Sequence, residues 1–297
     1  MSGPPRLFDR NLLDARRRRA LARPVPDADF LLRAIVDDIG ERLGAVQRRF
    51  ALGADIGTPL DLLARRLAAD GQVERIVRLD RIGETRPDVV ADPEALPLAE
   101  ASVDLAVSAL ALHWCDDLPG ALAQIRRALK PDGLFLAALL GGDTLTELRQ
   151  SLAAAEADIT GGASPRVAPF TELRAAGALL QRAGFALPVI DMDRRTVRYA
   201  SALHLMRDLR AMGAANALVE RSRRPLPRAV LARAVEIYAE RFSDPDGRVR
   251  ATFDVISLSG WAPHDSQQKP LRPGSAKARL ADALSTVERS AGEKAGG

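Results

Sequence analysis

The sequence predicts an α/β protein with a doubly wound, mostly parallel sheet, and two observations support this fold class. Short apolar or β-branched segments alternate with helical segments of about ten residues, which is the pattern of βαβ units. The segment 134–140 is apolar at every position, so its strand needs helices on both faces. We therefore expect an open sheet between two helical layers.

The first half of the chain contains most of the expected sheet. A basic segment at residues 8–23 and an amphipathic segment at 26–49, with apolar residues spaced by three and four, predict two helices before it. Strands are expected at 50–52, 73–79, 89–91, 103–110 and 134–140, helices at 60–69 and 118–129, and a turn at 130–133.

The second half is expected to be more helical. Thr144 and Glu147 have the spacing of a capping box, which predicts a helix running toward Ile159. Further helices are expected at 171–183, 201–212 and 227–242, and strands at 185–191, 195–199 and 248–261. The predicted organisation is a helical N-terminal arm (1–45), a main domain (46–262) with a helical insertion at about 143–242, and a weakly ordered tail (263–297) with a short helix near 276–288.

The composition excludes several classes of protein. A single cysteine excludes an intrachain disulfide and a structural cysteine-based zinc site, and three histidines leave little for a histidine-rich metal centre. No apolar run approaches the roughly 20 residues of a membrane span. The net charge of +4 is small, acids are interleaved with the bases, and aromatics are 4% of residues, so nucleic acid is not an expected partner. No secretory leader is evident, and we expect a cytoplasmic protein.

Acidic residues follow two neighbouring strands of the expected sheet. In such sheets ligands bind beyond the carboxyl ends of the strands, at the switch point. Asp80 ends the second strand, where a carboxylate can accept hydrogen bonds from both hydroxyls of a ribose. Asp92 follows the third strand and suits an adenine amino group. Each acid alone is more typical of a helix cap or a turn, but their joint placement predicts a nucleoside site.

Three motifs carry a family resemblance. Segments 91–105, 112–119 and 129–133 resemble class I S-adenosylmethionine (SAM)-dependent methyltransferases. The flanking motifs at 8–10, 141–149, 164–166, 180–185, 250–253 and 260–267 are similar to the methyltransferase-like assembly factors of respiratory complex I, in an alphaproteobacterial form. These flanks distinguish them from the related malonyl-carrier-protein methyltransferases of biotin synthesis. The resemblance covers roughly residues 7–285.

The resemblance implies a fold, a cofactor and a partner. The fold is a seven-stranded Rossmann-like methyltransferase sheet whose reversed last strand would be residues 248–261. The cofactor is SAM, held by residues of the first four strand ends, namely Ala54, Asp55, Gly57, Asp80, Asp92, Pro93 and Ser108. The partner is the complex I subunit that carries the terminal iron–sulfur cluster, in which the mitochondrial member hydroxylates an arginine.

The first loop departs from the family's pattern of an acid followed by three glycines. Residues 53–59 read Gly-Ala-Asp-Ile-Gly-Thr-Pro, so only Gly57 remains as a loop glycine. Asp55 takes a glycine position, where its carboxylate would meet the methionine carboxylate of SAM and repel it. This predicts a weakened or lost methionine half of the site. The alternative is that Asp55, one pleat along, replaces the missing acid.

His113 and Trp114 are the candidate catalytic residues, because they lie where transferred groups meet acceptors in this fold. His113 is a candidate general base with a pKa near 7, and the alternative is a packing role for both rings. Cys115 is expected to be a packing residue rather than a nucleophile. The remaining candidates are Arg149 and Arg166 as lid or surface ion-pair residues, and His264 as a tail contact. The one conceivable metal set joins His113 and His264 with Asp116, Asp117 or Asp265, and we expect no metal.

Three functions remain open at this level. The first is an enzyme that modifies a protein side chain during complex I assembly. The second is a small-molecule or carrier-protein O-methyltransferase, and the third is a non-catalytic chaperone that has lost its cofactor. The basic segment 8–23 is expected either to dock on the main domain or to bind an acidic partner or the inner face of an anionic membrane.

Overall fold

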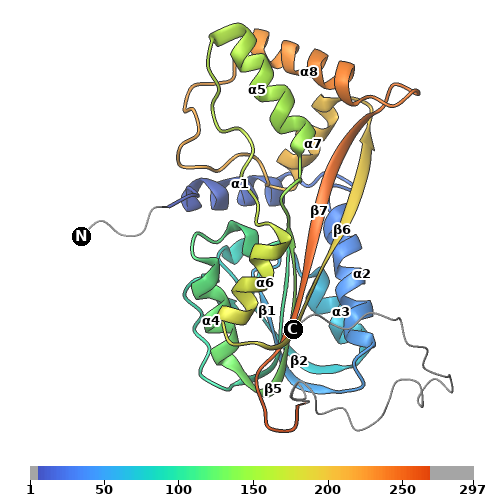
Figure 1. Cartoon of the computed structure of the whole chain (residues 1–297). Coiled ribbons are helices and arrows are strands. Elements are labelled where there is room, and N and C mark those ends of the chain that lie inside the picture. Colours follow the sequence, from blue (N-terminus) through green and yellow to red (C-terminus); the bar gives the residue numbers. More distant parts are fainter. Residues whose placement is uncertain (1–5, 268–297) are drawn as a thin grey trace, which may run out of the picture. The chain divides into compact units, whose positions relative to one another are not determined.

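The computed structural model of the protein describes residues 6–267 (Figure 1). Residues 6–263 belong to one compact unit, and His264–Gln267 begin a second. The strands of the first unit are β1 (Phe50–Ile56), β2 (Val73–Asp80), β3 (Val89–Val90), β4 (Val103–Ala109), β5 (Leu129–Leu140), β6 (Ala186–Tyr199) and β7 (Val249–Trp261). Its helices are α1 (Arg10–Ala22), α2 (Phe30–Gly44), α3 (Leu62–Asp70), α4 (Leu118–Ala128), α5 (Thr146–Thr160), α6 (Leu173–Arg182), α7 (Ala202–Ala211) and α8 (Arg228–Phe242), with 3-10 turns at Gly83–Thr85 and Leu112–Trp114.

The strands form one seven-stranded sheet in the order β3-β2-β1-β4-β5-β7-β6. Strands β1 to β5 pair in parallel, whereas β7 runs antiparallel to both β5 and β6. The predicted doubly wound sheet and its reversed last strand are therefore confirmed. Because the chain moves from β1 out to β3 and returns to β4, the switch point lies between β1 and β4.

Two hydrophobic cores hold the helices against the sheet. Helices α2 and α3 cover one face through side chains such as Ile39 and Leu67, and α4 and α6 cover the other through Leu122 and Leu180. The segment 134–140 of β5 is buried along its whole length, which explains why it is apolar at every position.

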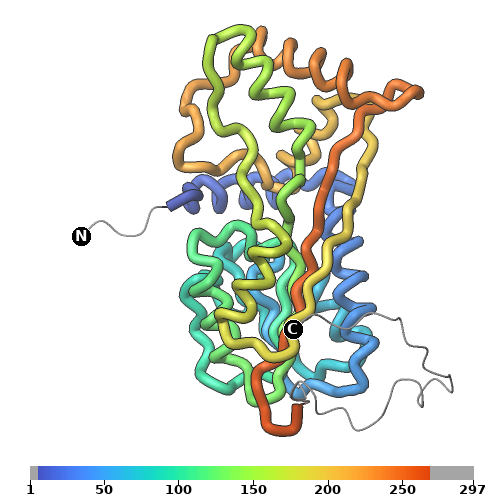
Figure 2. The backbone as a smooth tube through the Cα atoms, viewed as in Figure 1, coloured from blue at the N-terminus to red at the C-terminus, as the bar shows by residue number. Residues whose placement is uncertain are grey.

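The hairpin of β6 and β7 connects the sheet to a second helical layer. The two strands pair from Ala186 opposite Trp261 to Tyr199 opposite Val249, and they carry α7 and α8 between them. Helix α8 packs against α5 and α7, and Figure 2 shows the hairpin rising from the sheet to these helices. Helix α1 crosses between the helical layer and the carboxyl edge of the sheet (Figure 1).

Three local predictions are wrong. The expected turn at 130–133 lies within β5, at an irregularity in its pairing with β4, and in the other two cases β7 supplies the competing partner. The predicted break between residues 191 and 195 is absent because Arg194 pairs with Asp254 of β7, its register partner. The capping box is also absent. The Thr144 hydroxyl accepts from the Asp254 N–H at 3.1 Å and Glu147 accepts from the Thr252 N–H at 3.1 Å, so α5 begins only at Thr146.

The predicted N-terminal arm contains two helices with different surroundings. Helix α2 belongs to the core on one sheet face, whereas α1 lies over the carboxyl edge. The proposed boundaries of arm, main domain and insertion stay a prediction. Residues 268–297 of the expected tail, with the short helix near 276–288, lie outside the described residues. Within residues 6–267, no helix is long and apolar enough to cross a bilayer.

Candidate active site

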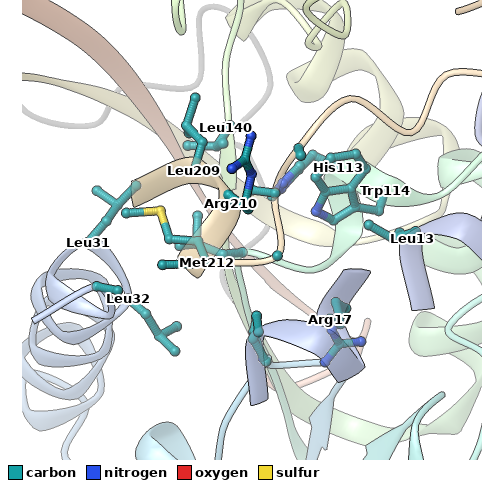
Figure 3. Close-up of a pocket in the computed structure, with 18 of the residues that line it drawn as sticks. Leu13, Arg17, Leu31, Leu32, His113, Trp114, Leu140, Leu209, Arg210 and Met212 are labelled. Atoms are coloured by element: carbon teal, nitrogen blue, oxygen red, sulfur yellow. The ribbon is translucent and has the colours of Figure 1, made fainter. Parts of the chain in front are cut away.

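A cavity of about 740 Å³ lies at the carboxyl edge of the sheet, beneath the helical layer. This volume is within the range of small-molecule sites, about 300–1,000 Å³. Most of its wall is apolar, and Figure 3 shows six of the apolar side chains that line it: Leu13 on α1, Leu31 and Leu32 on α2, Leu140 on β5, Leu209 on α7, and Met212 directly after α7. Gly57, Asp80, Asp92, Pro93, His113 and Trp114 also line it. The structure thus brings six of the nine predicted site residues to one cavity.

The other three predicted residues lie inside the sheet. Ala54, Asp55 and Ser108 are each at most 1% exposed, and none of them lines the cavity. The Ser108 hydroxyl donates to the carbonyl oxygen of Ile56 at 2.7 Å, and the Thr58 hydroxyl accepts from the Ala109 N–H at 3.0 Å. These bonds fasten the first loop to the end of β4, which leaves Ser108 no free side for a ligand.

Gly57 occupies the tightest position of the first loop. Its φ is 75°, and a Cβ atom there would lie 3.0 Å from Cβ of Ala111 and 3.2 Å from Cγ of Pro93. Glycine adopts this left-handed backbone without strain and leaves the required space. The single glycine that remains in the loop is therefore the one that the cavity wall requires.

Asp55 is a buried carboxylate in the wall behind the cavity. Among the described residues neither of its oxygens has a hydrogen-bond partner, and the Nε atom of Arg78 on β2 is 3.9 Å from Oδ2. Burial raises the pKa of Asp55 to about 7, although Thr58 and Arg78 oppose this shift. Because the side chain is enclosed in the sheet and does not line the cavity, the expected meeting with a ligand carboxylate is wrong. The alternative, that Asp55 replaces the missing acid, stays a prediction.

Asp80 does face the cavity, but an arginine of α1 already binds it. The Nη1 and Nη2 atoms of Arg17 donate to the two carboxylate oxygens, each at 2.8 Å. The hydroxyl of Thr85 donates to Oδ2, also at 2.8 Å. Asp80 is 1% exposed, so this is a buried, bidentate ion pair.

Asp92 lies in a second cluster of charges between α1 and the sheet edge. Its Oδ2 atom accepts from both Arg10 and Arg81. Arg10 also pairs with Glu94, and Arg81 pairs with Asp14 of α1 at 2.9 Å. The acid predicted to bind adenine is therefore used to hold α1 in place.

The start of α1 is fastened by main-chain bonds as well. Asp116 accepts from the N–H groups of Leu7 and Phe8, each at 2.9 Å, and the Phe8 ring packs edge-on against Trp114 at 5.2 Å between centroids. Trp114 thus has the packing role that the sequence offered as the alternative to catalysis, while it also lines the cavity.

His113 lies between Trp114 and Phe170, with ring centroids 5.2 and 6.0 Å away. Its Nδ1 atom is buried without a hydrogen-bond partner in the described part of the chain, and burial lowers the pKa of His113 to about 3. The expected pKa near 7 is therefore wrong, and the imidazole is neutral at physiological pH. A neutral ring can still accept or donate one hydrogen bond to a ligand in the cavity.

The remaining candidates have structural partners. Burial raises the pKa of the Cys115 thiol well above its usual value, as expected for a packing residue. Arg149 donates to two backbone carbonyls, whereas Arg166 pairs with Glu156 and lines the cavity. The His264 ring lies 2.7 Å from the hydroxyl of Ser266, its neighbour in the second unit. Over residues 6–267, no group of three histidine, cysteine or acidic side chains could hold a metal ion.

Comparisons with known proteins identify the family. Residues 44–137 match the methyltransferase domain family model. The chain is 38% identical over 289 residues to the arginine hydroxylase NDUFAF5 of Danio rerio, which covers 93% of this chain and 89% of the relative. The human protein of the same name is 38% identical over 91% of this chain and 81% of its own length. The chain belongs to the NDUFAF5 arginine-hydroxylase family.

More distant relatives agree with this fold. A malonyl-[acyl-carrier protein] O-methyltransferase of Methylovorus is 37% identical over 77% of this chain and 70% of its own length. A Bacillus halodurans protein assigned as a methyltransferase has a TM-score of 0.54 at 14% identity, over 77% of this chain and 99% of its own. The YcgJ protein of Bacillus subtilis has a TM-score of 0.51 at 15% identity, over 76% of this chain and 98% of its own length. The NDUFAF5-type chain therefore has the methyltransferase fold.

For this member of the NDUFAF5 family, the side chains as they lie do not fit SAM. The ribose hydroxyls would need the oxygens of Asp80, which Arg17 holds, and adenine would need Asp92, which Arg10 and Arg81 hold. The first loop offers one glycine instead of three. The fold is of the SAM-binding type, but arginines of the chain already pair with the two acids that are expected to bind the nucleoside.

Sequence reasoning missed Arg10, Arg17 and Glu94 as residues of this site. The motif at residues 8–10 and the arginine run that follows belong to the family resemblance, and they were the available signal. Helical periodicity could not reveal their role, because α1 docks mainly through ion pairs and the one apolar side chain buried on it is Leu13.

Proposed function

We propose that this chain modifies an arginine side chain of a protein, as the names of its NDUFAF5 relatives indicate. The observation that carries the proposal is the 38% identity over 93% of the chain, a span that includes the sheet, the cavity and the helices above it. The family resemblance further points to the complex I subunit with the terminal iron–sulfur cluster as the protein substrate.

The cavity supports a side-chain substrate. Residues of α1, α2 and α7 line it, and Asp80, Asp92 and His113 lie at the strand-end side of the cavity. An arginine has an apolar stem and a cationic end, which suit an apolar wall with carboxylates at one end.

Mass spectrometry of complex I from cells with and without the gene tests this proposal. We expect one arginine of the client subunit to lose a modification in the deletion strain, together with complex I activity. A lost oxygen atom would identify hydroxylation, and a lost methyl group would identify methylation. Unchanged arginines and normal complex I would refute the proposal, and a requirement for biotin in the deletion strain would favour the carrier-protein O-methyltransferase.

One observation favours a second candidate, a non-catalytic chaperone. Arg17 pairs with Asp80, the acid that the family resemblance assigns to the cofactor. In that case an Asp80→Ala variant that still folds would restore complex I in the deletion strain, whereas an enzyme that depends on Asp80 would not. Attachment to the inner face of the membrane through the exposed arginines Arg18 and Arg19 of α1, and a cytoplasmic location, stay predictions.

A further inference from the structure

We propose that Asp80 binds the guanidinium group of the substrate arginine, and that Arg17 holds this position as an internal substrate mimic. The inference rests on the proposed function, since it assumes that the site acts on an arginine. It assigns Asp80 a different ligand from the ribose that the methyltransferase fold implies.

The geometry of the pair is that of guanidinium recognition. Two nitrogens of Arg17 meet two oxygens of Asp80 at equal distances of 2.8 Å, and the Thr85 hydroxyl fixes the carboxylate from a third direction at 2.8 Å. A planar guanidinium matches a carboxylate in this way, whereas a lysine ammonium cannot form both parallel bonds. The position therefore distinguishes arginine from lysine.

The buried charge of Asp80 itself favours a cationic ligand. Asp80 is 1% exposed, and the charge of this carboxylate contributes to the raised pKa of Asp55 in the wall behind it. The nearby cations already have acidic partners, since Arg78 on β2 is 3.9 Å from Asp55 and both Arg10 and Arg81 pair with Asp92. If Arg17 left and a ribose entered, two neutral hydroxyls would face a buried anion, whereas an incoming guanidinium would restore the lost ion pair.

The position of Arg17 allows such an exchange. Its side chain lines the cavity, whose apolar wall includes Leu13 on one side and Leu31 and Leu32 on the other (Figure 3), so a substrate arginine that reached Asp80 would have apolar surface for its stem. Arg17 is the second of four consecutive arginines at 16–19, so α1 presents the chemistry of the proposed substrate at the proposed site. In such an exchange, the bidentate pair between Arg17 and Asp80 is replaced by an equivalent pair between the substrate arginine and Asp80.

Binding measurements on the full chain test the proposal. The probes are a short peptide with one central arginine, the same peptide with lysine, and S-adenosylhomocysteine as the nucleoside. We expect Arg17→Ala to bind the arginine peptide about ten-fold more tightly than the wild type, with no gain for lysine. The matched control is Arg18→Ala, which removes the exposed pair with Glu84 on the same helix and should behave as the wild type.

Two further measurements keep the test decisive if Arg17→Ala folds poorly. N-ethylguanidinium should raise the melting temperature of Arg17→Ala but not that of the wild type, and ethylammonium should not. Arg17→Lys keeps the positive charge but loses the two parallel donors of the guanidinium. Its affinity for the arginine peptide should therefore rise less than that of Arg17→Ala. The additional change Asp80→Asn should abolish every gain.

Two outcomes would overturn the proposal. A gain for S-adenosylhomocysteine alone would assign Asp80 to a nucleoside. No gain for any probe would mean that the pair only supports the fold. These binding assays do not use the cellular client. Mass spectrometry that finds no modified arginine in the client would therefore refute the proposed function without changing the binding result.

Discussion

Asp55 and Asp80 are buried carboxylates on adjacent strands, but their surroundings differ. Each is 1% exposed, yet Asp80 accepts three hydrogen bonds from Arg17 and Thr85, whereas neither oxygen of Asp55 accepts one from any described residue. The pKa of Asp55 is raised, whereas Asp80 binds Arg17, a cation on α1 that lies 63 residues away in the sequence. Burial alone therefore does not define an acid's role, because its partners decide whether it stays charged.

The largest expected effect comes from removing the cation of the paired acid. Arg17→Ala should lower the free energy of unfolding by about 3–5 kcal/mol, because it leaves the Asp80 carboxylate buried without its cation. Urea unfolding at pH 7 measures this loss. An effect as small as that of an exposed ion pair would show that Asp80 does not need Arg17.

A substitution at Asp55, the acid without a strong partner, should raise the free energy of unfolding instead of lowering it. Asp55→Asn should stabilise the protein by about 2–4 kcal/mol at pH 8 and much less at pH 4, because it removes a charge that the sheet does not accommodate. The folded pKa of about 7 lies above the unfolded value of about 3.9, so the folded state binds more protons between them. Wild-type stability should therefore fall from pH 4 to pH 7 relative to Asp55→Asn. Parallel pH profiles of the two proteins would contradict this assignment.

A smaller effect is expected at the loop between the two acids. Gly57→Ala places a side chain at φ 75° and 3.0 Å from Cβ of Ala111, which should cost about 1–2 kcal/mol. Thermal unfolding measures this cost. Gly71→Ala is the matched control, because φ there is 70° but no described atom lies within 4 Å of the added Cβ. Equal losses would mean that backbone strain, and not the cavity wall, sets the cost.

The smallest effect is expected for an exposed pair of the same helix. Arg18 and Glu84 are 46% and 51% exposed, so Arg18→Ala should change the unfolding free energy by less than about 0.5 kcal/mol. A loss close to that of Arg17→Ala would show that α1 depends on its total charge rather than on the Asp80 pair.

The sequence predicted the fold well because the sheet has strong local signals. Apolar strands such as 134–140 and the alternation with helices are properties of short segments. It also placed Gly57, Asp80, Asp92 and Pro93 at one cavity, since strand ends of a parallel sheet meet at one edge. It did not place Asp55 or Ser108 correctly, because which side of a strand end faces the edge depends on packing against β2 and β4.

The partners of the acids could not be predicted, since they depend on contacts distant in sequence. Arg10 and Arg17 lie 82 and 63 residues from the acids that they bind, and nothing local marks which arginine of the run meets which carboxylate. The capping box failed for the same reason. Thr144 and Glu147 bind β7, more than 100 residues away, which no local motif encodes.

The β6–β7 hairpin determines which wall of the cavity can yield. Since β7 is hydrogen-bonded to β5 on one side and to β6 on the other, helices α7 and α8, which lie between β6 and β7 in the chain, are tied to the sheet by a continuous ladder. Helix α1 has no such continuity and is held by charge pairs at its sheet-facing side and by the main-chain bonds of Leu7 and Phe8 to Asp116. The wall formed by α1 is therefore the one that can open to admit a ligand, because its release breaks side-chain pairs and two main-chain bonds and leaves the hydrogen-bond ladder of the hairpin intact.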